Sequence, residues 1–390
     1  MPPFSLLIKP ASADCNLRCD YCFYLEKSGI YPSKPKHRMS DDVLERMISS
    51  FLQTEQPNYS FGWQGGEPTL MGVDFFRRVT ELQQKYGRAG AQISNGLQTN
   101  ATLIDDEFAE HLGRYRFLVG VSLDGPSAIH DHYRVHADGR GSHAEVMKGI
   151  SNLRKHGVEF NVLVLVSKSN VKRPREIYNY LKEQGVYYHQ YIECVEFDDQ
   201  GNLMPYAIEP QEWGEFLCAI YDEWRKEDTY RVSIRRFDSI VGKMVDGGVR
   251  ACNMGEDCRQ YFVVEHNGDI YPCDFFVEPR LLLGNVMKDR WETLQRHPLY
   301  QEFGRRKRRY APECGECKFL EFCHGDCPKN RMRGPSSTPE QLSHLCAGWK
   351  MFYSHALPGL KELAEEVKRQ QQPPAVGSGG SSGGEARGKR

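Results

Sequence analysis

The chain has 390 residues and a nearly balanced charge, with 51 lysines and arginines against 52 aspartates and glutamates. A protein that binds nucleic acid through electrostatics would carry a strong basic excess, so this composition argues against that class. No segment approaches the roughly 20 consecutive apolar residues of a membrane span, and the first ten residues lack the features of a signal peptide. A cytoplasmic protein is therefore expected, in which the 13 cysteines stay reduced and favour metal binding over disulfides.

The first 195 residues alternate between strand-like and helix-like segments. The predicted strands are short and rich in β-branched and aromatic residues, and they span residues 5–9, 59–63, 91–98, 117–123, 160–167 and 187–193. Amphipathic segments separate them at residues 41–52, 74–86, 105–112, 142–156 and 175–184. Six strands with five intervening helices predict an α/β fold with a parallel sheet, an open partial (βα)6 barrel. Ligands should then gather at the carboxyl ends of the strands.

The rest of the chain changes character twice. Residues 210–250 look helical and connecting, residues 252–346 are dense in cysteines and turns, and helical periodicity returns at residues 349–368. We therefore predict domains at 1–235 and 236–369, followed by a disordered tail at 370–390, which is rich in glutamine, proline, glycine and serine. The basic run at residues 305–309 is interpreted as a solvated surface stretch, with a contact for an acidic partner as the alternative.

Three cysteines follow the first predicted strand with the spacing C-x3-C-x2-C, namely Cys15, Cys19 and Cys22. Three thiolates leave one iron of a cubane iron–sulfur cluster without a protein ligand, in the way that catalytic zinc sites keep an open position. An open iron at the carboxyl end of a parallel strand can bind the amino and carboxylate groups of S-adenosylmethionine (SAM). A zinc knuckle is the alternative, and this spacing is unusual for zinc.

This loop resembles the signature of the radical SAM superfamily. In that family a [4Fe-4S] cluster reduces SAM and a 5′-deoxyadenosyl radical forms. The resemblance implies SAM contacts at residues that lie beside the loop or near the ends of strands: Tyr21, Gly66, Ser122, Arg134 and Val195. Gly66 belongs to a Gly-Gly-Glu-Pro run that would approach the methionyl part of SAM closely, whereas Tyr21 and Val195 would flank its adenosine. For Val195, ordinary packing is an equal alternative.

Eight further cysteines lie in the C-terminal half, and eight thiolates suffice for two fully coordinated clusters. Their pattern resembles the SPASM extension of radical SAM enzymes that modify peptides and proteins, with two structural zinc ribbons as the alternative. The resemblance implies one [4Fe-4S] cluster on Cys252, Cys258, Cys273 and Cys327 and a second on Cys314, Cys317, Cys323 and Cys346. Three [4Fe-4S] clusters are thus expected in the whole chain. Cys194 and Cys218 remain and are interpreted as structural.

Within the superfamily, the chain is most similar to anaerobic sulfatase-maturating enzymes, on residues 15–24, 64–68 and 271–275. These enzymes convert a cysteine or serine of a sulfatase to Cα-formylglycine. The resemblance implies that the deoxyadenosyl radical removes hydrogen from the substrate Cβ, that a base removes the thiol or hydroxyl proton, and that an electron leaves through an auxiliary cluster. Asp274 is the implied base, with a turn-capping role as its alternative. Tyr24 and Gln64 are expected to line the pocket.

The implied partners are a sulfatase polypeptide and a reducing electron donor such as flavodoxin or ferredoxin. A different reading is maturation of a ribosomal peptide by thioether or carbon–carbon cross-links. Such maturases often carry an extra N-terminal peptide-binding domain, and a first strand at about residue 5 leaves no room for one. A third hypothesis is a protein without catalytic activity, either an electron carrier or a metal-stabilised binding module, which predicts no SAM cleavage. The sequence leaves open whether cysteine or serine is the residue modified.

Overall fold

The computed structural model describes residues 2–32, 36–334, 337–338 and 340–371, so the tail predicted at 370–390 lies almost wholly outside the described residues. Its strands form one ten-stranded sheet in the order β10-β9-β8-β1-β2-β3-β4-β5-β6-β7. The strands are β1 (Ser5–Lys9), β2 (Asn58–Trp63), β3 (Gln92–Thr99), β4 (Leu118–Ser122), β5 (Phe160–Val166), β6 (Tyr188–Glu193), β7 (Ser233–Ile234), β8 (Tyr261–Glu265), β9 (Asp269–Tyr271) and β10 (Gly284–Asn285).

Helices connect and cover these strands. They are α1 (Asp41–Leu52), α2 (Gly72–Tyr86), α3 (Asp106–Arg114), α4 (Ser127–Tyr133), α5 (His143–Lys155), α6 (Pro174–Glu183), α7 (Pro210–Glu227), α8 (Arg235–Asp246), α9 (Trp291–Arg296), α10 (Pro298–Arg306), α11 (Pro312–Gly315), α12 (Leu320–Cys323), α13 (Pro328–Arg331) and α14 (Cys346–Gln371). Short 3-10 turns lie at η1 (Glu26–Ile30), η2 (Pro68–Met71), η3 (Cys252–Met254), η4 (Asp274–Phe276) and η5 (Pro279–Leu281). Among the described residues, no helix is long and apolar enough to cross a membrane.

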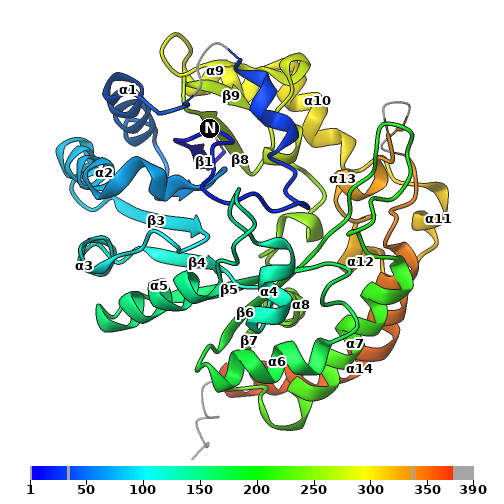
Figure 1. Cartoon of the computed structure of the whole chain (residues 1–390). Coiled ribbons are helices and arrows are strands. Elements are labelled where there is room, and N and C mark those ends of the chain that lie inside the picture. The colour runs from blue at the N-terminus through cyan, green and yellow to red at the C-terminus, as the bar shows by residue number, and fades with distance from the viewer. Residues whose placement is uncertain (1, 33–35, 335–336, 339, 372–390) are drawn as a thin grey trace, which may run out of the picture.

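The first half of the chain is the predicted partial barrel. Strands β1 to β7 pair in parallel, each with the next, and α1, α2, α3 and α5 lie on the outer side of the sheet (Figure 1). Helix α1 shows why the periodicity predicted it: the Ser40 side chain accepts a hydrogen bond from the Val43 amide, and one face, including Leu44, Met47 and Phe51, is buried against the sheet. The predicted α/β class is confirmed.

The cysteine-rich region is joined to the barrel through the sheet itself. Strand β8 pairs in parallel with β1, with Ser5 opposite Tyr261 and Lys9 opposite Glu265. Strands β9 and β10 then continue the sheet in antiparallel fashion. Local sequence patterns do not predict this connection, because the partner strands are separated by about 250 residues and each is short. The added strands bring the turn that carries Asp274 beside the carboxyl end of β1.

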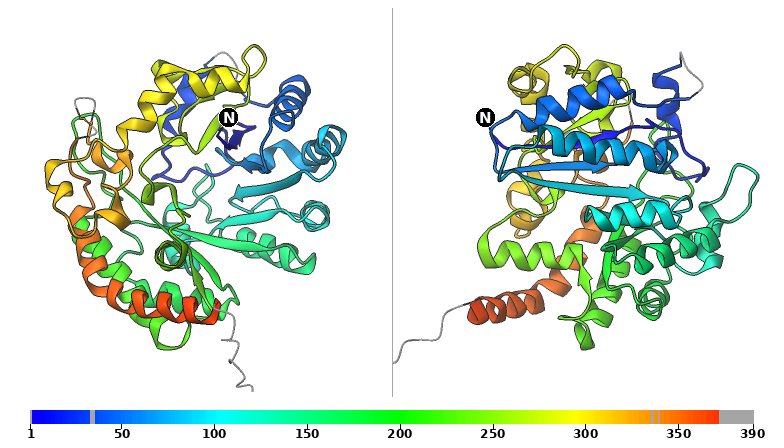
Figure 2. Two further views of the ribbon diagram at one scale, coloured as in Figure 1. Left: turned by 180° about the vertical axis from the view of Figure 1, so that it is seen from behind. Right: turned by 90° about the vertical axis from the view of Figure 1, so that its left-hand side faces the viewer.

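Helix α14 closes the opposite end of the molecule, where it runs beside α7 (Figures 1 and 2). Trp213 on α7 meets Trp349 on α14 edge to face, with ring centroids 5.5 Å apart. The two helices approach closely because glycines face each other: a Cβ added at Gly214 would lie 3.0 Å from the Gly348 Cα. The domain boundary predicted after residue 235 falls at the start of α8, which contacts β6, β7 and α14. That boundary stays a prediction.

The basic run at 305–309 was predicted to be solvated, and at Lys307 this was wrong. Arg305, Arg308 and Arg309 are exposed, whereas Lys307 is 0% exposed. Helix α10 ends at Arg306, and Lys307 then points inward and donates hydrogen bonds to backbone carbonyls of the cysteine-rich region. A short run of like charges does not reveal which member turns inward after a helix end.

Candidate functional site

The loop that carries the first three cysteines leaves the carboxyl end of β1 and is held by the loop that follows β2. The amide of Gly66 donates to the Ser12 carbonyl at 2.8 Å, and the amide of Glu67 donates to the Asp14 carbonyl at 2.7 Å. A Cβ added at Gly66 would lie only 2.0 Å from the Asp14 carbonyl oxygen. Glycine is thus required here by the cysteine loop itself. The predicted contact of Gly66 with SAM stays a prediction.

Glu67 ties the same loop to the end of β3. Its buried carboxylate accepts hydrogen bonds from the Thr69 hydroxyl at 2.6 Å, from the Thr99 hydroxyl at 2.8 Å and from the Asn100 amide at 2.7 Å. Burial raises the pKa of Glu67, and these hydrogen bonds oppose the rise. The acidic residue of the Gly-Gly-Glu-Pro run therefore fixes the ends of two neighbouring strands relative to each other.

The three cysteines of the loop lie close together. Asn100, just beyond β3, donates to the Asn16 side chain at 2.9 Å and lies 3.8 Å from the Cys15 sulfur. Burial raises the pKa of Cys19 to about 12, and negative charge on Cys22 adds to this rise. Burial likewise raises the pKa of Cys15 to about 12, and negative charge on Glu67, Cys19 and Cys22 adds to this rise. Buried thiols of this kind become thiolates when a metal replaces their protons, so the set fits an iron–sulfur cluster.

Two of the predicted SAM contacts meet at a third residue, Asp124, which follows β4. The Tyr21 hydroxyl donates to the Asp124 carboxylate, and Arg134 donates to both of its oxygens, at 2.8 and 3.2 Å. The Arg134 guanidinium also lies over the Tyr21 ring, 5.5 Å from its centroid. Burial raises the pKa of Tyr21 well above its ordinary value, which keeps the phenol protonated as a donor. Asp124 orients both side chains, a role that its position at a strand end alone did not reveal.

Two other predicted SAM contacts lie at the end of β4 and just beyond the end of β6. The Ser122 hydroxyl at the end of β4 accepts a hydrogen bond from Gln98 of β3 at 3.2 Å. Val195 is 2% exposed and belongs to the hydrophobic core, and its carbonyl accepts a hydrogen bond from Lys329 at 2.7 Å. Lys329 thereby connects the cysteine-rich region to the end of the barrel. The structure places Val195 in the core, and its contact with the adenosine stays a prediction.

Asp274, the predicted base, is buried at the carboxyl edge of β1 and β2. Its Oδ2 atom accepts hydrogen bonds from the Tyr24 hydroxyl and from Gln64, the latter at 3.2 Å. Its Oδ1 atom lies 3.6 Å from the Lys9 ammonium. Both residues that were expected to line the pocket therefore contact Asp274 directly. This carboxylate also adjoins Cys273, so the predicted base and a predicted cluster ligand are consecutive in the chain.

Lys9 and Glu265 complete this cluster, and the sequence analysis missed both. The Lys9 ammonium is 2.9 Å from Glu265 and 4.6 Å from the centroid of the Tyr24 ring. Both ion-pair partners are almost fully buried. Burial would raise the pKa of Glu265, but the charge of Lys9 and side-chain hydrogen bonds from His266, Lys9 and Ser12 together outweigh it and lower that pKa to about 2. The available signal was a lysine at the last position of a buried strand, where lysine is rare.

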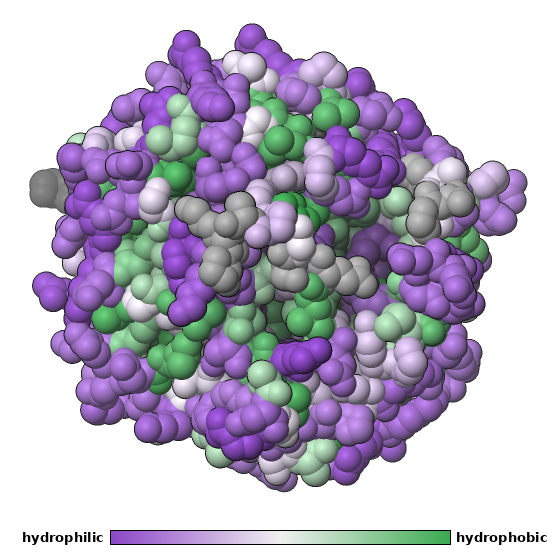
Figure 3. All heavy atoms as spheres, turned by 45° about the horizontal axis from the view of Figure 1, so that its top comes forward, coloured by the Kyte–Doolittle hydropathy of each residue, from purple (hydrophilic) through white to green (hydrophobic). Residues whose placement is uncertain are grey.

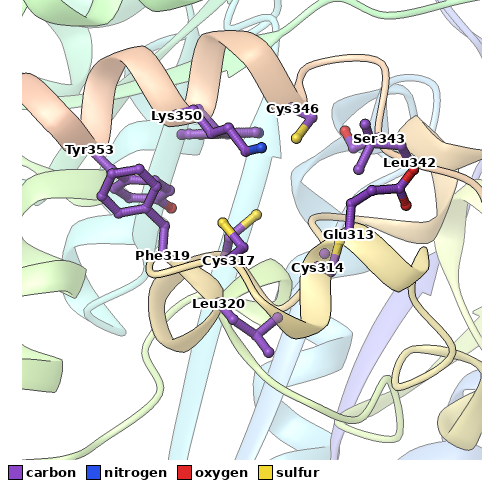
Figure 4. Close-up of a pocket in the computed structure, with 13 residues that line it drawn as sticks. Glu313, Cys314, Cys317, Phe319, Leu320, Leu342, Ser343, Cys346, Lys350 and Tyr353 are labelled. Carbon is purple, nitrogen blue, oxygen red and sulfur yellow. The ribbon is translucent and has the colours of Figure 1, made fainter.

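Four of the later cysteines line one cavity: Cys314, Cys317, Cys323 and Cys346. Figure 4 shows Cys346 and Lys350 extending from α14 toward Cys314 and Cys317. Burial raises the pKa of Cys314 and of Cys346, and the positive charge of Lys350 opposes both rises. The four sulfurs are those that the family resemblance assigns to one cluster.

The remaining four cysteines of the region form a second group around Cys327. Burial raises the pKa of Cys327 well above its ordinary value, and negative charge on Cys252, Cys273 and Cys258 raises it further. Among the described residues, no three Cys, His, Asp or Glu side chains converge on the position of a single metal ion. In a cubane cluster each thiolate binds a separate iron, and all-sulfur sets of four suit such clusters. Cys194 and Cys218 lie outside the three groups.

The family of the chain follows from comparison with known proteins. The model of the radical SAM superfamily matches residues 10–181, and the SPASM model, an iron-sulfur cluster-binding domain, matches residues 252–318. The chain is 38% identical to the serine-type anaerobic sulfatase-maturating enzyme of Bacteroides thetaiotaomicron, covering 95% of this chain and 94% of that protein. It is also 38% identical to the cysteine-type enzyme of Clostridium perfringens, covering 94% and 100% respectively.

Solved structures agree with these relatives. A structure described as native anSMEcpe with bound AdoMet and Cp18Cys peptide has a TM-score of 0.87 and 35% identity, covering 94% of this chain and 100% of that one. Streptococcus suis SuiB bound to its precursor peptide SuiA has a TM-score of 0.63 at 18% identity, covering 88% of this chain and 76% of SuiB, a likeness of fold alone. The chain therefore belongs to the anaerobic sulfatase-maturating enzymes, radical SAM enzymes that modify proteins and carry a SPASM iron–sulfur domain.

Proposed function

We propose that this enzyme oxidises a cysteine or serine side chain of a sulfatase to Cα-formylglycine. The observation that carries the proposal is the buried Asp274, held by Tyr24, Gln64 and Lys9 between the cysteine loop and Cys273. Relatives named as serine-type and as cysteine-type enzymes are equally similar to the chain, at 38% identity. We therefore leave both residues as substrates.

The oxidation removes one hydrogen atom from the substrate Cβ, one proton from its thiol or hydroxyl group, and one electron. When bound, SAM with its cluster supplies the hydrogen-abstracting radical, and an auxiliary cluster accepts the electron. In this chain, the Asp274 carboxylate takes the proton of the substrate thiol or hydroxyl group. Its Oδ2 atom is occupied by Tyr24 and Gln64. Oδ1 is buried 3.6 Å from the Lys9 ammonium, accepts no hydrogen bond from the described residues, and is the oxygen to which we assign the substrate proton. For cysteine, hydrolysis of the oxidised side chain then exchanges sulfur for oxygen.

The residues present fit three [4Fe-4S] clusters. Cys15, Cys19 and Cys22 would hold the one that binds SAM, and its fourth iron would stay free of protein ligands. The two groups of four would hold the auxiliary clusters: Cys252, Cys258, Cys273 and Cys327 in one, and Cys314, Cys317, Cys323 and Cys346 in the other. SAM would contact Tyr21, Gly66, Ser122, Arg134 and Val195. Of these, Tyr21 and Arg134 are already oriented by Asp124.

The proposed partners are a sulfatase polypeptide and a reducing donor such as flavodoxin or ferredoxin, and we propose a cytoplasmic location. On the face seen in Figure 3, hydrophobic side chains gather around a central hollow, while hydrophilic side chains cover the periphery. A hollow with apolar walls suits an extended peptide segment, because apolar side chains of the peptide lose contact with water there.

Paired peptides test this proposal. The protein is reconstituted anaerobically with iron and sulfide, reduced, and incubated with SAM and a sulfatase peptide that carries cysteine or, in a second sample, serine. We expect an aldehyde product by mass spectrometry: serine loses two hydrogens, and cysteine loses sulfur and two hydrogens and gains one oxygen. A peptide that instead gains an internal cross-link would overturn the proposal in favour of a ribosomal peptide maturase.

A further inference from the structure

A lysine lies between the two auxiliary cysteine groups and has no role in the reaction described above. Lys307 is 0% exposed, although its neighbours Arg305 and Arg308 are exposed. Its Nζ atom donates to the backbone carbonyls of Asn253 at 3.1 Å and of His324 at 3.0 Å, and to that of Asp326. Lysine is rarely buried without a partner of opposite charge, so its position needs an explanation.

The three contacts determine the charge of this lysine. A neutral amine has two N–H bonds, whereas the ammonium has three. Because carbonyl oxygens only accept hydrogen bonds, three carbonyl partners are satisfied together only by the ammonium. Lys307 thus places a full positive charge inside the cysteine-rich region.

Each of the three carbonyls belongs to a residue beside a cluster cysteine. Asn253 follows Cys252, His324 follows Cys323, and Asp326 precedes Cys327. The ammonium therefore touches segments of both cysteine groups. A second buried cation, Arg331, also 0% exposed, donates to the same His324 and Asp326 carbonyls, at 2.8 and 2.9 Å.

The negative charge that balances Lys307 is not a carboxylate in ion-pair contact. Within the part of the chain that the structure describes, no carboxylate oxygen lies at ion-pair distance from Lys307 Nζ. The nearby Asp326 carboxylate instead accepts from Asn330 at 3.0 Å and from Ser343 at 2.7 Å. Burial and the positive charge of Arg331 lower the pKa of Lys307, and negative charge on Asp326 and then on Cys327 and Cys258 opposes this. Asp326 faces two buried cations, Lys307 and Arg331, and clusters on the neighbouring cysteines would supply further negative charge to balance them.

We propose that Lys307 is the internal counter-cation of the auxiliary clusters and raises the reduction potential of the cluster on Cys252, Cys258, Cys273 and Cys327. The inference rests on the proposed occupancy of those cysteines by an iron–sulfur cluster. A nearby positive charge stabilises the reduced form, which carries one more negative charge than the oxidised form. The cluster beside Asp274 thereby becomes a better acceptor for the electron that leaves the substrate.

The test measures reduction potentials and needs neither SAM nor a sulfatase peptide. In the full-length chain, Cys15, Cys19 and Cys22 are all changed to Ala, so that the auxiliary clusters alone are reconstituted. Lys307→Met and Lys307→Gln remove the charge, Lys307→Arg keeps it, and Arg308→Met removes an exposed charge from the same run as a matched control. Iron and sulfide content are measured first, and potentials are then obtained by titration monitored by electron paramagnetic resonance.

We expect Lys307→Met and Lys307→Gln to disfavour reduction of one auxiliary cluster by about tenfold, a shift of roughly 59 mV for one electron. Lys307→Arg and Arg308→Met should stay near the parent value. If the neutral variants lose that cluster while Lys307→Arg retains it, the result also supports the proposal, because the cluster then requires a positive charge at residue 307. Unchanged potentials in the neutral variants, or equal cluster loss in all three Lys307 variants, would overturn the proposal. Because no substrate is used, the result is independent of whether the enzyme makes formylglycine.

Discussion

The two cysteine-bearing regions of the chain meet where β1 pairs with β8 within one sheet, but they are built in opposite ways. The N-terminal loop presents three thiols within residues 15–22 and is held by backbone contacts to Gly66 and Glu67. The C-terminal region draws eight thiols from residues 252–346, and its two groups interleave along the sequence. Its segments are joined instead by the buried cations Lys307 and Arg331. Both donate hydrogen bonds to backbone carbonyls of residues that lie next to the cysteines.

This difference teaches how one fold separates two tasks. We propose that the compact loop with three thiols leaves one metal position open for SAM, whereas the two sets of four thiols leave no position open and suit electron storage and transfer. The buried side chains of Lys9, Glu265 and Asp274 lie where the two regions join, because β8 pairs with β1.

Removing one thiol of the loop should abolish SAM cleavage. In Cys22→Ala the remaining Cys15 and Cys19 cannot hold the cluster that binds SAM, so 5′-deoxyadenosine should fall to background when measured by chromatography after anaerobic reduction. Cys194→Ala is the matched control, since Cys194 is buried near the same loop but belongs to no cysteine group. Persistent cleavage in Cys22→Ala would place the SAM-binding cluster elsewhere.

Replacing the base should separate the two half-reactions. Asp274→Asn keeps the side-chain shape but removes a proton acceptor, so formylglycine formation should fall by about 10² to 10⁴ while SAM cleavage continues. Product aldehyde and 5′-deoxyadenosine are measured in the same reaction. Glu278→Gln, four residues further on and on the more exposed side of the turn, should leave both rates unchanged. Equal aldehyde yields from Asp274→Asn and the parent enzyme would remove Asp274 from the mechanism.

Breaking the ion pair at the junction should destabilise the protein. Lys9→Met leaves two buried carboxylates, Glu265 and Asp274, without their cation, and loss of one partner of a buried pair costs about 3–5 kcal/mol. Lys85→Met is the control, because Lys85 pairs with Glu45 at the surface, where a pair contributes about 0–1 kcal/mol. Denaturant unfolding of both variants gives the comparison. Equal free energies of unfolding would mean that the buried pair does not hold the two regions together.

Adding one methyl group to the loop contact should have a smaller effect. Gly66→Ala forces a Cβ to within 2.0 Å of the Asp14 carbonyl, and overpacking of this kind costs about 1–3 kcal/mol. Gly29→Ala is the control, since a Cβ there would meet no atom within 4 Å. The free energy of unfolding and the iron content are measured together. If Gly66→Ala and the parent protein have the same free energy of unfolding, the cysteine loop tolerates separation from the loop that follows β2.

Local sequence patterns predicted many of the helices and strands. The features that they did not predict depend on contacts between residues far apart in the sequence. Helix α1 and strand β1 match their predicted bounds, because periodicity and capping lie within the segment itself. The pairing of β8 with β1 and the burial of Lys307 depend on partners far away in the sequence. The site residues came from the resemblance to a family, and the structure adds what motifs lack: Asp124 as the anchor of Tyr21 and Arg134.

The division between an open and two closed clusters can be tested most directly by asking which cluster responds to SAM. Electron paramagnetic resonance spectra of the reduced, reconstituted protein are recorded with and without SAM, for the parent chain and for the variant in which Cys15, Cys19 and Cys22 are alanine. We predict that SAM changes the spectrum of the parent and leaves that of the variant unaltered. A spectrum of the variant that responds to SAM, or a parent spectrum that does not, would contradict the account.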